Sequence, residues 1–167
     1  MTNVCIVSDP LLVDPLTGLG TRNALLADLA AAVEGQHGPS LLVVFGLEGL
    51  DEYVTLFGSL ASRALLVKLG ARLTDALGPE SSCYRPRQDE FAGLVPTPIE
   101  AVAEVLDRAV TALRERDASV AVSAAWGAAM LPEEADDAVG ALKLADTRLA
   151  SNAPRRRRRN RRTRPKG

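Results

Sequence analysis

The sequence predicts an α/β domain of the α+β kind, with helices flanking a mixed, mainly antiparallel central sheet. Segments with helical periodicity alternate with short runs rich in β-branched residues along most of the 167 residues. Two strand-like runs are adjacent and lie between helices, which favours a hairpin and antiparallel pairing over a purely parallel sheet. Hydrophobic residues make up 47% of the chain and aromatic residues only 4%, so aliphatic side chains should fill the core of one domain.

The first half of the chain contains two predicted helices around one buried strand. After a short apolar segment at 4–7, apolar residues at helical spacing over 24–34 predict a first helix. The β-branched-rich run 41–45 predicts a buried strand. Residues 50–77 then carry a long apolar stripe at helical spacing, and Gly58 predicts a bend in this second helix.

The second half of the chain contains the predicted hairpin. It spans 81–95, and Pro86 within it is best tolerated on an edge strand. A third helix is expected over 99–116, a strand over 119–129 and a last helix over 136–150. We therefore expect the element order α, β, α, β, β, α, β, α.

The end of the sequence is strongly basic, although the net charge of the whole chain is only −1. Nine of the 20 Lys and Arg residues fall within 155–166, which leaves 11 bases against 21 acids, a charge of −10, in the remainder. The cationic residues of this tail are Arg155, Arg156, Arg157, Arg158, Arg159, Arg161, Arg162, Arg164 and Lys166. We divide the chain into an N-terminal segment (1–13), a folded domain (14–153) and a tail (154–167) that is expected to be disordered.

Three roles remain open for the tail. It can tether the domain to RNA, DNA or anionic lipid, act as a disordered solubilising tail, or lie on the acidic body. Because it contains no aromatic residue for base stacking, any binding to nucleic acid should be electrostatic and indifferent to sequence.

Other features of the composition argue against a membrane protein and a metal site built on cysteine. No apolar run approaches the ~20 residues of a membrane span, and no signal sequence is visible, so we expect no transmembrane segment and a cytoplasmic location. Cys5 and Cys83 lack metal-ligand spacing and are expected to be reduced. His37 falls in a loop, where a solvated side chain is the simplest interpretation.

Four motifs in order resemble one family over residues 14–150. DPLTGLGTR at 14–22 is similar to the DxLTGLxNR entry motif of GGDEF domains, and RPRQDEF at 85–91 is similar to their RxGGDEF hairpin. AWGAA at 125–129 resembles the SIGVA strand, and ADTRL at 145–149 resembles the ADxAL helix. The resemblance implies the palm-like fold of nucleotide cyclases and the diguanylate cyclase reaction, in which two GTP molecules are joined into cyclic di-GMP.

In this family, carboxylates from the first strand and the hairpin hold the divalent ions of catalysis. The resemblance places Gly46, which has no side chain, at the first-strand position, and Glu48 two residues later. Asp89 and Glu90 match the hairpin carboxylates, as vestigial catalytic residues. Asp89 and Glu48 are therefore the candidate metal ligands, and Mg²⁺ and GTP are expected only if activity or binding is retained.

The nucleotide-binding positions of the family also differ in this chain. Val54 and Arg63 stand where the family has a guanine-reading Asn and Asp, so guanine should lose its hydrogen-bond partners. Arg87 and Gln88 replace the two hairpin glycines and are candidate nucleotide contacts.

Two further motifs of the family are altered. The phosphate-binding Lys of the family corresponds to Ala153. Arg157 corresponds to an Arg that follows this Lys in the family, and it is a candidate phosphate contact. The product-inhibition motif RxxD is missing, with Gly78 and Ser81 at its positions.

The pattern of loss favours a degenerate, catalytically inactive GGDEF-like domain that acts as a regulatory or binding module in bacterial cyclic-dinucleotide signalling. The alternatives are an active diguanylate cyclase and an adaptor tethered to polyanions by its tail. The expected partner is a second copy of the chain or another GGDEF or signalling protein.

Overall fold

The structure is a computed structural model that describes residues 11–154. The elements in chain order are α1 (Arg22–Val33), β1 (Ser40–Glu48), α2 (Leu50–Leu77), β2 (Ser82–Arg87), β3 (Glu90–Pro96), η1 (Ile99–Ala101), α3 (Val102–Ala112), β4 (Glu115–Arg116), β5 (Ala121–Leu131) and α4 (Ala138–Asn152). The predictions for the apolar segment 4–7, for Cys5 and for the tail from Arg155 onward lie outside the described residues.

The sheet has the strand order β2-β3-β1-β5-β4, and every pairing between these strands is antiparallel. Strand β1 lies at the centre, where Gly46 stands opposite Glu90 on β3 and Ala125 on β5. The hairpin formed by β2 and β3 lies at one side, with β2 on the edge, which suits the prolines of this region. The predicted α+β fold with a mainly antiparallel sheet is confirmed.

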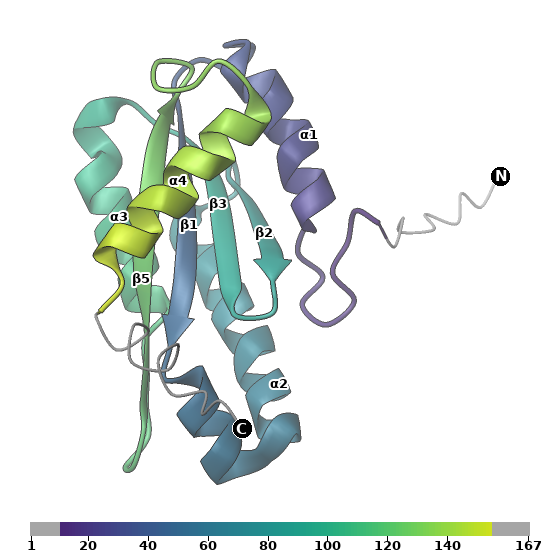
Figure 1. Cartoon of the computed structure of the whole chain (residues 1–167), viewed down its shortest axis with the longest axis vertical. Helices are drawn as coiled ribbons and strands as arrows, with labels where there is room; N and C mark the ends of the chain where they lie inside the picture. Colours follow the sequence, from purple (N-terminus) through teal and green to yellow (C-terminus); the bar gives the residue numbers. More distant parts are fainter. Residues whose placement is uncertain (1–10, 155–167) are drawn as a thin grey trace, which may run out of the picture.

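Helices cover both faces of the sheet (Figure 1). Helices α2 and α3 pack on one face, where their leucines and valines meet Leu41, Val43 and Phe45 of β1. Helices α1 and α4 pack on the other face against Leu42 and Val44. Because consecutive residues of β1 serve opposite faces, the whole apolar strand is buried, as its β-branched composition predicts.

Helix α4 lies unusually close to β5 at Gly127. A Cβ atom built at this glycine would collide with the backbone of α4 at Ala145, Arg148 and Leu149. A residue without a side chain is therefore required for this helix to pack onto the sheet. The contact explains the glycine in AWGAA and holds α4 closely against β5.

Helix α2 is divided by a kink at Gly58. This residue has φ 85° and ψ 173°, a conformation that only glycine adopts readily, so the predicted bend is confirmed. By length and composition, α2 is the one described helix apolar enough to cross a membrane. Its stripe from Leu65 to Leu77 packs against the sheet, as in the core helix of a folded domain.

The region after α3 differs from the prediction. The helix expected over 99–116 begins as the 3₁₀ turn η1 and ends at Ala112, and Glu115 and Arg116 form the short strand β4 beside β5. Glu115 pairs there with Lys68 at 3.2 Å and Arg72 at 2.7 Å, both on α2. Contacts across the fold therefore end this helix earlier than its apolar pattern indicates.

Candidate functional site

The loop before α1 is bound to the hairpin by Arg85. The carboxylate of Asp14 accepts hydrogen bonds from the backbone N–H of Thr17 at 3.0 Å and from its hydroxyl at 2.6 Å. The same carboxylate contacts Nη1 of Arg85 at 3.2 Å, and Nη2 of Arg85 donates to the carbonyl of Gln88 at 2.9 Å. One guanidinium therefore joins the loop and the tip of the hairpin.

The charge of Asp14 is stabilised at this junction. Burial alone would raise the pKa of Asp14, but the hydrogen bonds from Thr17 and the guanidinium of Arg85 outweigh it and hold the pKa below its ordinary value. The Nε of Arg85 is buried without a hydrogen-bond partner among the described residues. Arg85 is thus a structural cation of the site, held mainly through its two terminal nitrogens.

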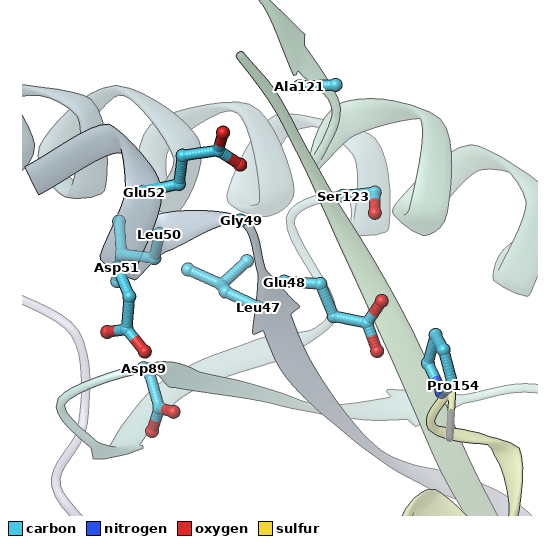
Figure 2. Close-up of a pocket in the computed structure, with 10 residues that line it drawn as sticks. All are labelled: Leu47, Glu48, Gly49, Leu50, Asp51, Glu52, Asp89, Ala121, Ser123 and Pro154. Carbon is cyan, nitrogen blue, oxygen red and sulfur yellow. The ribbon is translucent and has the colours of Figure 1, made fainter. Parts of the chain in front are cut away.

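An acidic cavity of about 430 Å³ opens at the end of β1 (Figure 2). The residues that line it are Leu47, Glu48, Gly49, Leu50, Asp51, Glu52, Asp89, Ala121, Ser123 and Pro154. Glu48 extends toward Pro154, whereas Asp51 and Asp89 lie on the other side of Leu47 in this view. Gly49 has φ 83° and turns the chain tightly from β1 into α2, which brings the first-turn acids Asp51 and Glu52 to the cavity.

A second cavity, of about 690 Å³, lies between the hairpin, α2 and the loop before α1. Its lining includes Val54 and Arg63 from α2 and Arg85, Gln88 and Asp89 from the hairpin. The structure thus brings together the positions at which the resemblance expects the guanine contacts and the hairpin. At these two positions the cavity has an apolar and a cationic side chain, where the resemblance expects an amide and a carboxylate.

The turn of the hairpin separates its charged side chains. Asp89 lines both cavities, and its carbonyl accepts a hydrogen bond from the N–H of Leu47 at 2.9 Å. Glu90 is buried, and its carboxylate lies 3.7 Å from Nε of Arg87. Burial raises the pKa of Asp146 on α4, and Arg87 opposes that rise. Arg87 therefore faces Glu90 and α4, while Gln88 and Asp89 face the cavities.

The residues present do not fit the divalent ion that the fold family implies. A Cβ built at Gly46 would lie 3.5 Å from the side chain of Leu149, so an apolar side chain covers the first-strand position. Glu90 is paired with Arg87. Among residues 11–154, no group of three or more His, Cys, Asp or Glu side chains is arranged to hold a metal ion.

The candidate ligands predicted from the sequence are only partly brought together. Glu48 and Asp89 line the same cavity, whereas Glu90 is directed elsewhere and Arg157 lies outside the described residues. Asp51 and Glu52 were not predicted from the sequence as residues of this site. Two acids shortly after a glycine and at the start of a helix are the signal that would have identified them, because acids are favoured in a first helical turn.

Two other residues singled out in the sequence lie away from these cavities. His37 is exposed in the loop between α1 and β1, as predicted. Cys83 is a free, half-buried thiol in β2, and burial raises its pKa.

Comparison with known proteins identifies one family. The family model described as "Diguanylate cyclase, GGDEF domain" matches residues 11–160. A sensory box/GGDEF family protein from Caulobacter crescentus is 29% identical, with a TM-score of 0.73, over 84% of this chain and 96% of that chain. A microbial GGDEF domain with a novel interaction mode with cyclic di-GMP is 26% identical, with a TM-score of 0.73, over 85% of this chain and 92% of that chain.

The similarity to one longer cyclase is low in sequence and shows only that the fold is shared. The diguanylate cyclase SiaD of Pseudomonas aeruginosa, solved in complex with its activator SiaC, is 24% identical with a TM-score of 0.72. The similarity covers 84% of this chain but only 57% of that one. Comparison with curated protein sequences found no significant match. Since the family model spans nearly the whole described domain and the four motifs lie on the matching elements, the chain belongs to the GGDEF family of diguanylate cyclase domains.

Proposed function

We propose that this domain does not make cyclic di-GMP and acts as a regulatory binding module in cytoplasmic cyclic-dinucleotide signalling. The observation that carries the proposal is the first-strand position, where Gly46 offers no carboxylate and lies under Leu149. Phosphoryl transfer in this family depends on divalent ions that neutralise developing charge. Losing a ligand at that position removes transition-state stabilisation that the buried, paired Glu90 is not placed to replace.

The test of inactivity uses the full chain with GTP and either Mg²⁺ or Mn²⁺. We expect no cyclic di-GMP above the level of a heat-denatured sample when products are separated and identified by mass spectrometry. The variant Asp89→Ala serves as the matched control because Asp89 lines both cavities. Turnover by the wild-type chain that disappears in Asp89→Ala would overturn the proposal.

One observation favours the alternative of an active cyclase. Glu48 and Asp89 line one cavity, so two of the family's candidate ligand positions retain a carboxylate at the end of β1. Val54 and Arg63 argue against this alternative, because they remove the groups that would recognise guanine. The same assay decides between the two functions.

The second cavity supports the binding of a nucleotide without turnover. It retains Arg63 and Gln88, whose nitrogen donors can bind phosphate oxygens. A relative that is 26% identical interacts with cyclic di-GMP, which makes this compound and GTP the ligands to test by calorimetry. Arg63→Ala should weaken binding at this cavity, whereas Arg108→Ala on α3 is the matched control. Equal effects of the two variants would place the ligand elsewhere.

A surface for a protein partner lies next to this cavity. Apolar side chains are exposed around the kink of α2, with Leu60 83% exposed and Leu56 56% exposed, beside the partly exposed Val54 and Phe57. Clustered exposed apolar side chains are typical of interaction surfaces. The partner we propose is a second copy of the chain or another GGDEF protein. Light scattering should show a smaller mass for Leu56→Ser/Leu60→Ser if the chain self-associates through this surface.

A further inference from the structure

The cavity at the end of β1 carries a concentrated negative charge. Glu48, Asp51, Glu52 and Asp89 line it, and none of its described lining residues is basic. The N-terminus of α2 contributes only about half a positive charge at this point, so the described lining of the cavity is net negative. Asp51 and Glu52 are also exposed to solvent, so a cationic segment can reach them.

The chain itself leads into this cavity after α4. The side-chain amide of Asn152 donates to the carbonyl of Trp126 on β5 at 2.8 Å, and the N–H of Ala153 donates to the carbonyl of Leu149 at 2.9 Å. The first contact holds the last turn of α4 against the sheet, and the second closes that turn. Pro154, the next residue, lines the cavity (Figure 2), and the residue that follows it is Arg155.

The segment that begins there has the opposite charge. Residues 155–167 contain nine Lys and Arg residues, no acid and no aromatic residue. An extended chain spans about 3.3–3.6 Å per residue, so a few residues suffice to cross a cavity of this size. A segment tethered at the rim also has an effective concentration in roughly the millimolar range, which makes individually weak ion pairs sufficient for occupancy.

We propose that the acidic cavity at the end of β1 is the docking site of the chain's own arginine-rich tail. The acids of the cavity and a polyanion then compete for the tail. A docked tail lies against these acids, and a released tail is available to nucleic acid or another polyanion. This inference goes beyond the proposed function, because it concerns the tail and stands whether or not the domain turns over GTP. It also predicts that added salt releases the tail, since exposed charge pairs are screened.

The test compares two pairs of substitutions in the full chain. Asp51→Asn/Glu52→Gln removes two acids from the first turn of α2 at the cavity. The control variant, Glu100→Gln/Glu104→Gln, removes two acids from the first turns of η1 and α3. These turns follow the end of β3, which pairs with the start of β1, whereas the cavity lies at the other end of β1. The net charge therefore changes equally in both variants. Cleavage of the tail by trypsin at low salt, followed by mass spectrometry, reports how often the tail is undocked.

We expect cleavage within 155–166 to be about threefold or more faster in the cavity variant than in the wild type, and to change less than about twofold in the control variant. Heparin affinity, measured by fluorescence anisotropy at low salt, should rise more in the cavity variant for the same reason. Equal cleavage rates in the two variants would overturn the proposal. Equal gains in heparin affinity would also overturn it, and would indicate a tail that is always available to polyanions.

Discussion

Asp14 and Arg85 are 71 residues apart in the sequence, and their side chains meet at 3.2 Å in the structure. Both side chains are nearly buried, at 14% and 11% exposure. The pair connects the loop before α1 to the hairpin, so the shape of the second cavity depends on it. Replacing either partner leaves the other charge poorly solvated, which is costly in a buried pair.

The variant Asp14→Asn should lower the free energy of unfolding by about 2 kcal/mol at neutral pH. The pKa of Asp14 is lowered in the folded state from an ordinary value of 3.8, so its charge stabilises the fold above that pH. This contribution disappears as pH falls through the lower, folded-state pKa. Urea denaturation should therefore show the gap between wild type and variant closing between about pH 5 and pH 2.

Asp107→Asn, an exposed position on α3, is the control for this comparison and should change stability by less than about 0.5 kcal/mol. A gap between wild type and Asp14→Asn that stays constant with pH would show that Asp14 acts through its shape and not its charge.

Gly46→Asp should not restore cyclase activity. The new carboxylate would lie against Leu149 and opposite Glu90, so we expect a loss of about 2–4 kcal/mol in unfolding free energy and no cyclic di-GMP. Gly46→Ala separates the two effects, because its Cβ makes an ordinary contact and should cost less than about 1 kcal/mol. Activity from the single Gly46→Asp change would show that Val54 and Arg63 do not disable the nucleotide site.

Gly127→Ala should be far more damaging than Gly46→Ala, although both add one methyl group to a buried strand. At Gly127 the methyl group would collide with the backbone of α4, which cannot move aside as a side chain can. We expect a loss of about 3 kcal/mol, measured by thermal or urea unfolding. Similar costs for the two substitutions would mean that α4 shifts easily on the sheet.

The tail should bind polyanions through charge alone. With several phosphate contacts, affinity for mixed-sequence RNA or DNA should fall by orders of magnitude between about 50 and 200 mM salt. A chain ending at Pro154 retains all the described helices and strands and is the control. Binding that survives this truncation, or that prefers one sequence strongly, would exclude the tail as a nonspecific electrostatic tether.

Much of the fold was predictable because its elements have strong patterns. The second helix was expected over 50–77 and spans those residues, and the bend at Gly58 follows from the conformations open to glycine. Strand β4 was not predictable, since two charged residues carry no apolar alternation. Its Glu115 is held by Lys68 and Arg72 of a distant helix, and no local pattern encodes such a contact.

The candidate site was predictable in its positions but not in the directions of its side chains. The family resemblance gives Glu48 and Asp89 as candidate metal ligands, and both line one cavity, although they lie on opposite sides of Leu47 in Figure 2. The resemblance does not reveal that Arg87 faces Glu90 and α4, because that depends on where α4 crosses the sheet. Asp51 was overlooked because its importance comes from the sharp turn at Gly49.

The central position of β1 also determines when this domain can begin to fold. Neither neighbour of β1 is close in sequence: Ser40 pairs with Pro96 on one side and with Leu131 on the other. During synthesis on the ribosome, the sheet cannot close until nearly the whole domain has emerged. Such long-range pairing places the chain among slowly folding topologies. Until β5 arrives, the most apolar strand of the protein has an open edge, which makes this the stage of greatest exposure to aggregation.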